Sequence, residues 1–141
     1  MKNVAIIYWS GTGNTEAMAN NAFEGAKSAG ANAEIFTCSE FNVANAENFD
    51  AFALGCPAMG SEELEDSEFE PLYQALKPKL AGKKVALFGS YGWGGGEWMN
   101  AWESDCFSGA PIKACDSVIT EDSPNEAVLK KCEELGSALA K

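Results

Sequence analysis

The strongest constraint in this sequence is a stretch near the N-terminus where an apolar run passes into a helix-forming segment through glycine and hydroxyl residues. Residues 4–8 are typical of a buried strand, and residues 16–19 begin a segment of helical composition. Between them lies Trp9-Ser10-Gly11-Thr12-Gly13-Asn14-Thr15. Such a turn directs several backbone N–H groups at one point, where the helix dipole adds positive potential. The stretch therefore predicts a site suited to a phosphate.

The charge of the chain argues against several partners and several kinds of chemistry. Its formal net charge is -11, with ten lysines, no arginine and no histidine among 141 residues. Nucleic-acid binding needs a clustered basic surface, so we expect no nucleic-acid partner and no anionic membrane. A protein with a basic docking patch would be attracted instead. Without histidine the commonest general base and metal ligand is missing, and we predict no catalytic residue and no metal site.

The cysteines and the hydropathy pattern indicate in which cellular compartment the protein lies. The five cysteines are scattered and form no C-x-x-C pair, so they are interpreted as reduced thiols. No stretch approaches the eighteen or so apolar residues of a membrane span, and the N-terminal apolar run lacks a cleavage pattern. We therefore expect a cytoplasmic protein, and we expect it to be a monomer.

Strand-like and helix-like segments alternate along the whole chain. Strands are predicted at residues 4–8, 33–37, 51–56 and 83–89 and within 112–119, and helices at 14–29, 67–76, 97–107 and 124–140. For the last helix, Ser123 is the predicted N-cap and Pro124 the first helical residue. This alternation predicts one α/β domain, residues 1–141, with a parallel sheet covered by helices on both faces.

Three glycine-containing loops follow predicted strands, at residues 9–15 (the first loop), 57–62 (the second loop) and 90–96 (the third loop). Because the strands are parallel, all three loops meet at one edge of the sheet, where such folds bind ligands. The first loop has no Walker A lysine, and the third glycine of G-x-G-x-x-G would fall at Glu16. It offers neutral donors instead, although a capped turn without a ligand would need the same residue types.

The third loop suits a planar ligand, whereas the residues of the second loop are each ordinary in isolation. Trp93 stands among glycines, which favours stacking on a ligand ring over core packing, although it could also fold back over the helix beneath it. The second loop offers Met59, Gly60 and Glu62. The carboxylates of residues 63–68 are interpreted as a solvated acidic face rather than as catalytic groups.

Together, three segments resemble the FMN loops of the short-chain flavodoxins of anaerobic bacteria. They are residues 9–16 (WSGTGNTE), 55–63 (GCPAMGSEE) and 87–94 (LFGSYGWG), in the same order as in that family. The resemblance implies a flavodoxin-like three-layer sandwich, a five-stranded parallel sheet of order 2-1-3-4-5, and noncovalently bound FMN. Two rival hypotheses are a flavin-dependent quinone reductase and a signalling receiver domain. The first lacks a basic group for a second cofactor, and the second lacks a phosphoacceptor aspartate at a strand end.

The resemblance also implies which residues bind the cofactor. Residues 10–15 would hold the 5'-phosphate, Met59 and Trp93 would flank the isoalloxazine ring, and Gly60, Ser61 and Glu62 would meet its N5 and N3 edge. The full predicted set is Trp9, Ser10, Gly11, Thr12, Gly13, Asn14, Thr15, Pro57, Ala58, Met59, Gly60, Ser61, Glu62, Ser90, Tyr91, Gly92, Trp93 and Gly94.

The function implied is that of a low-potential one-electron carrier that shuttles electrons between redox enzymes and is not itself an enzyme. It would use the semiquinone/hydroquinone couple of FMN. A turn of the Gly60 carbonyl toward N5 would stabilise the semiquinone by a hydrogen bond worth about 1 kcal/mol. Nearby carboxylates would oppose the anionic hydroquinone and make the second couple strongly reducing.

Overall fold

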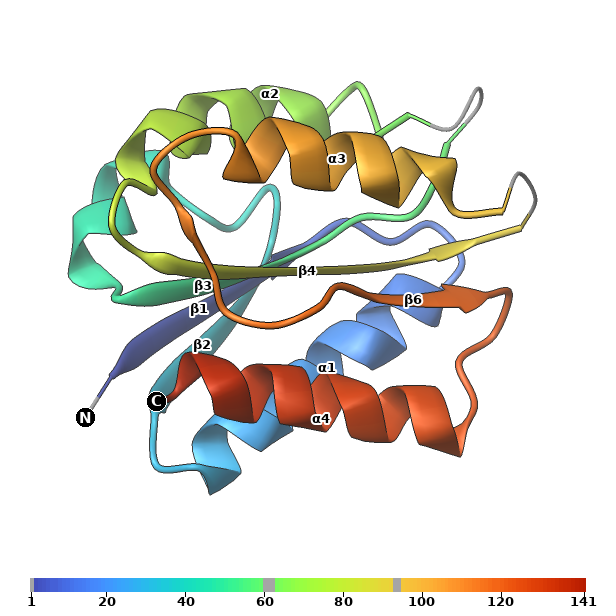
Figure 1. Cartoon of the computed structure of the whole chain (residues 1–141), viewed down its shortest axis with the longest axis horizontal. Helices are drawn as coiled ribbons and strands as arrows, with labels where there is room; N and C mark the ends of the chain where they lie inside the picture. The colour runs from blue at the N-terminus through green and yellow to red at the C-terminus, as the bar shows by residue number, and fades with distance from the viewer. Residues whose placement is uncertain (1, 60–62, 93–94) are drawn as a thin grey trace.

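A parallel β-sheet with helices on both faces organises the chain (Figure 1). The computed structural model describes residues 2–59, 63–92 and 95–141. The strands are β1 (Asn3–Tyr8), β2 (Asn32–Thr37), β3 (Ala51–Gly55), β4 (Lys84–Tyr91), β5 (Ile112–Lys113) and β6 (Val118–Glu121). The α-helices are α1 (Asn14–Ser28), α2 (Phe69–Leu76), α3 (Glu97–Phe107) and α4 (Glu126–Leu139), and the 3-10 helices are η1 (Val43–Asn48) and η2 (Lys77–Lys79). Within the described ranges, no helix combines the length and the apolar character needed to cross a membrane.

The strand order is β2-β1-β3-β4-β5, which confirms the predicted topology. The position beyond β4 is shared by two short strands, because β5 pairs with the start of β4 and β6 pairs with its end. One continuous strand within residues 112–119 was the expectation. The break between β5 and β6 contains Ser117, whose hydroxyl binds Glu103 of α3, and Lys113 also forms an ion pair with Glu103 (3.3 Å). These polar contacts draw the chain toward α3 and away from the sheet.

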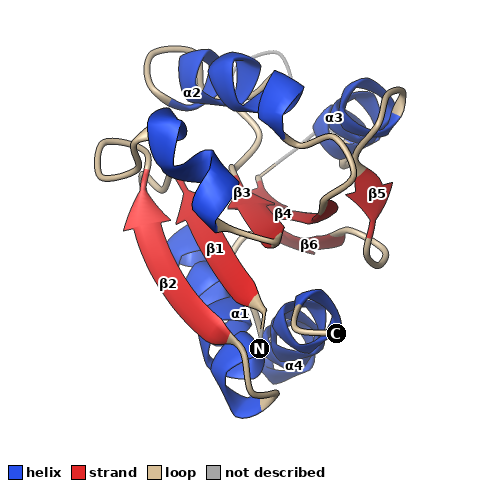
Figure 2. Cartoon of the chain, turned by 90° about the vertical axis from the view of Figure 1, so that its left-hand side faces the viewer, coloured by secondary structure: helices blue, strands red, loops and turns tan. Residues whose placement is uncertain are grey.

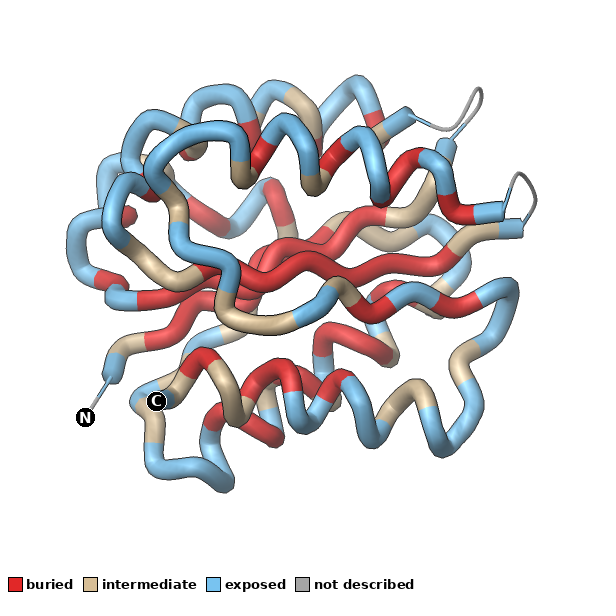
Figure 3. The backbone as a smooth tube through the Cα atoms, in the orientation of Figure 1, coloured by how far each residue is buried: buried red, intermediate tan, exposed pale blue. Residues whose placement is uncertain are grey.

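Alternating side chains of the sheet build a separate core on each face. In β3, Phe52 and Leu54 face the α2 and α3 side, whereas Ala51 and Ala53 face α1 and α4. Such alternation follows from the two-residue period of a strand. Figure 2 shows the sheet between the two helical layers, and Figure 3 shows the central strands buried along most of their length. The central strands are covered on both sides, which explains their continuous apolar sequences.

Helices α1 and α4 approach each other closely because each places a glycine against the backbone of the other helix. A Cβ atom on Gly136 would overlap the Ala22 carbonyl oxygen of α1, and one on Gly25 would overlap the Glu133 carbonyl oxygen of α4. The two helix backbones are therefore in direct contact. The apolar face of α1 (Met18, Ala22 and Ala26) is fully buried in this layer.

Three predicted boundaries differ from the structure by two residues. Helix α2 begins two residues later than expected, at Phe69, and β4 continues through Ser90 and Tyr91, which were assigned to the third loop. Helix α4 begins at Glu126 with Asn125 as its N-cap, so the assignment of Ser123 and Pro124 to the helix start is wrong. The Asn125 side chain accepts a hydrogen bond from the Val128 N–H (2.9 Å), which fixes the start two residues further along the chain.

We expect Asn125→Ala to lower the free energy of unfolding by about 1 kcal/mol, because it removes the only side-chain cap of α4 seen in the described residues. Ser123→Ala is the matched control, since Ser123 is equally exposed and should cost less than about 0.5 kcal/mol. Urea unfolding followed by circular dichroism measures both. Equal losses in the two variants would contradict the assignment of the cap to Asn125.

Candidate functional site

A cavity of about 260 Å³ lies at the carboxyl edge of the sheet, where the three loops meet. Its walls come from every loop that the sequence pointed to, and also from Asp122 beyond β6. The lining residues are Trp9, Gly11, Thr12, Asn14, Pro57, Ala58, Met59, Ser90, Tyr91, Gly92 and Asp122. Of the other predicted residues, Ser10, Gly13 and Thr15 do not line this cavity, although they belong to the same first loop. Gly60, Ser61, Glu62, Trp93 and Gly94 lie outside the described residues.

The first loop presents the N-terminus of α1 without a capping side chain. Gly13 is the N-cap residue with φ of 97°, a left-handed conformation that favours glycine, and α1 has no side-chain cap hydrogen bond. The Ser10 hydroxyl accepts a hydrogen bond from the Gly13 N–H (3.0 Å) and so shapes the turn. The first N–H groups of a helix lack partners within the helix. At α1 no side chain caps them, and a helix N-terminus of this kind suits an anion.

A buried hydroxyl pair joins the first loop to β4. The Thr15 and Ser90 hydroxyl oxygens are 3.2 Å apart, and the two residues are 1% and 5% exposed. Ser90 also has its carbonyl oxygen bonded to the Ala58 N–H (2.9 Å) of the second loop. Ser90 therefore connects all three loops.

Trp9 forms a fixed wall between the cavity and the start of α2. Its indole N–H donates to the Glu68 carboxylate (3.0 Å), and its backbone N–H donates to the Gly55 carbonyl (3.0 Å). A Cβ atom on Gly11 would lie 3.1 Å from the Trp9 ring, so the first loop folds closely over the indole. Glu68 therefore has a structural contact and is more than a solvated charge.

A pair of backbone hydrogen bonds closes the second loop. Met59 and Glu63 exchange N–H···O bonds of 2.8 and 2.9 Å, as in an antiparallel pair. The Met59 side chain is 37% exposed, which places an apolar thioether at the rim of the cavity. At the start of the loop, Cys56 is fully buried, and burial raises the pKa of its thiol so that it stays protonated at neutral pH.

The interpretation of residues 63–68 as a solvated acidic face is wrong for Glu65, which is only 5% exposed. Its carboxylate accepts hydrogen bonds from the N–H groups of Ser67 (2.9 Å), Glu68 (2.8 Å) and Phe69 (2.9 Å), and from the Ser67 hydroxyl. Burial alone would raise the pKa of this carboxyl, but these hydrogen bonds outweigh it and lower the pKa to about 2. Glu65 thus anchors the chain where the second loop joins α2.

Asp122 is a cavity residue that the sequence analysis did not identify. Its backbone N–H donates to the Tyr91 carbonyl oxygen (2.7 Å), and its φ of 59° is the only positive value at a non-glycine residue in the described chain. It follows β6, whose carboxyl end reaches the same edge as those of β3 and β4. Its position directly after the last strand could have identified Asp122 as a cavity residue, but the sequence did not define where that strand ends.

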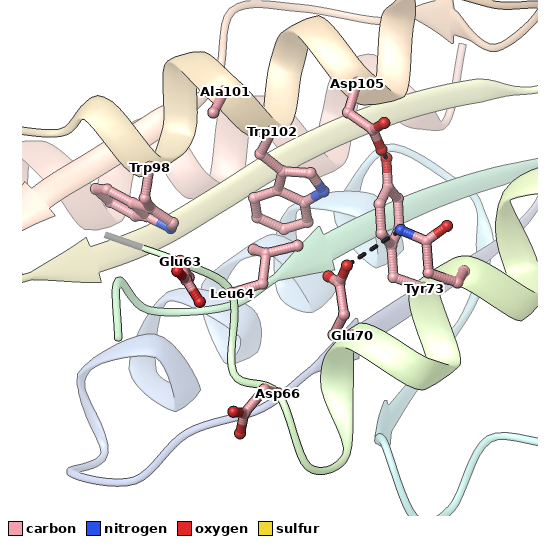
Figure 4. A pocket seen from close by; sticks show the side chains of 10 residues that line it. Glu63, Leu64, Asp66, Glu70, Tyr73, Trp98, Ala101, Trp102 and Asp105 are labelled. Carbon is pink, nitrogen blue, oxygen red and sulfur yellow. Dashed lines mark hydrogen bonds between the residues drawn. The ribbon is translucent and has the colours of Figure 1, made fainter. Parts of the chain in front are cut away.

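A second groove, of about 340 Å³, lies between α2 and α3 (Figure 4). Its lining includes Glu63, Asp66 and Glu70 together with the ring faces of Tyr73 and Trp102. It shares no residue with the cavity at the sheet edge and includes no residue of the first loop. Asp105 at one end accepts hydrogen bonds from the Tyr73 hydroxyl and the Lys77 ammonium, both at 2.8 Å. The groove is therefore larger than the cavity, but its lining lacks the glycine and hydroxyl residues of the first loop.

Comparison with known proteins was consistent across sequence and structure. A family model described as Flavodoxin matches residues 6–108. The chain is 52% identical to a flavodoxin of Megasphaera elsdenii over 98% of both chains. It is 43% identical to a flavodoxin of Clostridium beijerinckii, over 96% of this chain and 97% of the relative. The solution structure of two-electron reduced Megasphaera elsdenii flavodoxin superposes with a TM-score of 0.88, at 51% identity over 97% of this chain and 98% of that one.

Glu65→Gln is expected to flatten the acid limb of the stability curve. The pKa of Glu65 is lowered from 4.5 to about 2, so its contribution to stability is complete above pH 4.5 and is lost as the pH falls toward 2. That contribution is roughly 3 kcal/mol at neutral pH. Urea unfolding at pH 7 and pH 3 should show a smaller difference between the two pH values for the variant than for the wild type.

Asp66→Asn is the control for this experiment, because Asp66 is exposed and adjacent in sequence. It should keep the wild-type dependence on pH. If Glu65→Gln retains the full wild-type difference between pH 7 and pH 3, the network of hydrogen bonds at Glu65 does not stabilise the folded state.

Proposed function

Because this chain belongs to the flavodoxin family and is therefore an electron-transfer protein that binds FMN, we propose that its FMN occupies the cavity at the carboxyl edge of the sheet. The phosphate would lie on the first loop and the flavin ring between the second and third loops. The observation that carries this proposal is the convergence of three loops on one cavity beside the uncapped N-terminus of α1.

The donor groups of the first loop fit a phosphate ester. Thr12 and Asn14 line the cavity, and the hydroxyl of Ser10 accepts the Gly13 N–H in the same turn. These side chains are neutral, so the positive potential comes from the N–H groups of α1. A single terminal phosphate can be held in this way without a basic side chain.

The remaining walls fit the flavin. Trp9, Tyr91 and Met59 give the cavity aromatic and thioether surface, and FMN when bound supplies two one-electron couples on its own ring system. The chain orients that ring and limits its contact with water. We further propose that Met59 and Trp93 flank the ring, and that Gly60, Ser61 and Glu62 meet its polar edge.

We propose that the second couple is strongly reducing, because carboxylates surround the site. Asp122 lines the cavity and Glu63 closes the second loop. A negative charge about 10 Å away at an effective dielectric near 20 opposes a second negative charge by on the order of 1.7 kcal/mol, or about 70 mV. Several such charges outweigh a single hydrogen bond of about 1 kcal/mol.

We propose that the partners are redox proteins with basic docking patches, because the charges of this chain are segregated. All lysines except Lys130 and Lys131 lie at the amino edge of the sheet or at the helix ends beside it: Lys2, Lys27, Lys77, Lys79, Lys83, Lys84, Lys113 and Lys141. Residues 9–16, 57–68, 90–97 and 121–126 at the opposite edge contain ten acidic residues and no lysine. The cofactor edge is therefore the face that a basic partner attracts.

We also propose a monomer in the cytoplasm. Among the described residues, the large hydrophobic side chains that are clearly exposed are Met59, Ile112 and Ile119, and they lie on separate elements, which gives little surface for a stable dimer. The five cysteines are free thiols, which suits a reducing compartment.

Thr12→Ala tests the placement of the phosphate. Thr12 is exposed at the cavity, so the change should leave folding intact and weaken FMN binding roughly tenfold, since a hydrogen bond to a charged group is lost. Quenching of flavin fluorescence measures the Kd. Riboflavin has no phosphate, and its Kd should stay the same in the variant. Equal weakening of both ligands would contradict the proposed orientation.

Ionic strength tests the proposed docking face. The second-order rate of electron transfer from the reduced protein to a small basic haem protein should fall about tenfold between 10 and 150 mM salt. With the anionic acceptor ferricyanide the rate should rise over the same range, because repulsion is screened. Stopped-flow absorbance measures both rates, and a rate to the basic acceptor that does not depend on salt would argue against electrostatic docking.

A further inference from the structure

We propose that Trp98 is a positioning residue whose indole holds the second and third loops in the arrangement that receives FMN. The inference rests on the proposed location of FMN in the cavity at the sheet edge. Trp98 does not line that cavity, and its effect would reach the cofactor through Cys56 and Tyr91.

The indole N–H of Trp98 binds the backbone at the point where the second loop begins. Trp98 lies in the first turn of α3 and is 1% exposed, and its Nε1–H donates to the Cys56 carbonyl oxygen (3.2 Å). Cys56 is fully buried and follows the last residue of β3. The next three residues, Pro57, Ala58 and Met59, all line the cavity. A hydrogen bond at Cys56 therefore fixes the direction in which the second loop leaves the sheet.

The same indole packs against the residue from which the third loop begins. The Tyr91 and Trp98 rings have centroids 5.4 Å apart and planes at 49°. Tyr91 ends β4 and lines the cavity, and its carbonyl oxygen accepts the hydrogen bond from Asp122. One side chain from α3 thus contacts both loops that would enclose the flavin ring.

Gly89 shows that this contact requires a close approach. A Cβ atom on Gly89 would overlap the Cys56 carbonyl oxygen and would lie 3.1 Å from Cζ2 of Trp98. Only glycine at this position lets β4, the Cys56 carbonyl and the indole meet. If Trp98 were only a packed core residue, neither its hydrogen bond to Cys56 nor a glycine at position 89 would be needed.

Trp102 provides a comparison within the same helix. It lies one turn after Trp98, is 3% exposed, and has no hydrogen-bond partner for its indole nitrogen among the described residues. Figure 4 shows both indoles projecting from α3 toward the segment that carries Glu63 and Leu64. Trp102 packs against Phe69 and Tyr73 of α2, away from the cavity. The two tryptophans are alike in size and burial and differ in their link to the loops.

The decisive experiment compares Trp98→Phe with Trp102→Phe. Each variant loses part of a buried ring, but only Trp98→Phe leaves a buried carbonyl without its donor. We expect Trp98→Phe to raise the Kd for FMN about fivefold to tenfold, and Trp102→Phe to change it less than about twofold. Equal changes in Kd would overturn the positioning role. Failure of the wild-type protein to bind FMN would instead overturn the proposed function, and this inference with it.

Hydrogen exchange of the apoprotein gives a readout that does not involve the cofactor. The Ala58 N–H donates to the Ser90 carbonyl oxygen (2.9 Å) between the two loops. Its exchange should be at least about threefold faster in Trp98→Phe than in the wild type, and unchanged in Trp102→Phe. Unchanged exchange in both variants would contradict the proposal.

If Trp98→Phe does not fold, hydrogen exchange of the indole N–H groups in the wild-type protein tests the positioning role of Trp98. Binding of FMN should slow exchange of the Trp98 Nε1–H more than that of Trp102, because only Trp98 is tied to the loops that the ligand would order. Equal slowing at the two indoles would overturn the inference.

Discussion

The register of the three central strands is the constraint on which the site depends. Tyr8 of β1 is paired with Gly55 of β3, and Gly55 is paired with Phe88 of β4, so the three strands reach the same level of the sheet. The ladder then continues into the loops, because the Cys56 N–H binds the Phe88 carbonyl oxygen. A slip of one residue would turn every side chain of a strand to the opposite face. The alternating burial of the β3 side chains fixes the register of the strand, and the register in turn fixes the positions of the loops at its end.

The parts of this architecture that have local signals were predictable from the sequence. An apolar run followed by glycine and hydroxyl residues identifies a strand and its loop without knowledge of the rest of the chain, and this is why the parallel sheet and the three loops at one edge were predicted. The sheet order and the individual binding residues, ten of which line the cavity, came from the resemblance of the three loops to those of the short-chain flavodoxins. Glu65 was missed because a run of acidic residues is usually solvated, and its burial depends on the N–H groups at the start of α2. Ser123-Pro124 and Asn125 carry similar helix-start signals, and only the observed hydrogen bond distinguishes them.

If FMN occupies the proposed site, the groups that would hold its phosphate lie apart from carboxylates that would oppose added negative charge. Neutral donors and the N-terminus of α1 lie at the first loop, whereas Asp122 follows β6 and lines the cavity, and Glu63 pairs with Met59 at the second loop. Glu65 is the most buried of the described acidic residues in the second-loop region, and backbone N–H groups bind its carboxylate. In the proposed function, the acidic edge that would attract a basic protein would also make added electrons on the cofactor less stable, so docking and reducing strength would share one physical origin.

The unequal composition of the two helical layers has a consequence for optical measurements. Trp9, Trp98 and Trp102 all belong to the core on the α2 and α3 side, and the core on the α1 and α4 side contains no tryptophan in its described part. Emission from these three tryptophans therefore reports on only one half of the molecule. Separation of α1 from α4 would leave their emission nearly constant while far-ultraviolet ellipticity decreased, so a difference between the two signals would identify which layer opens first.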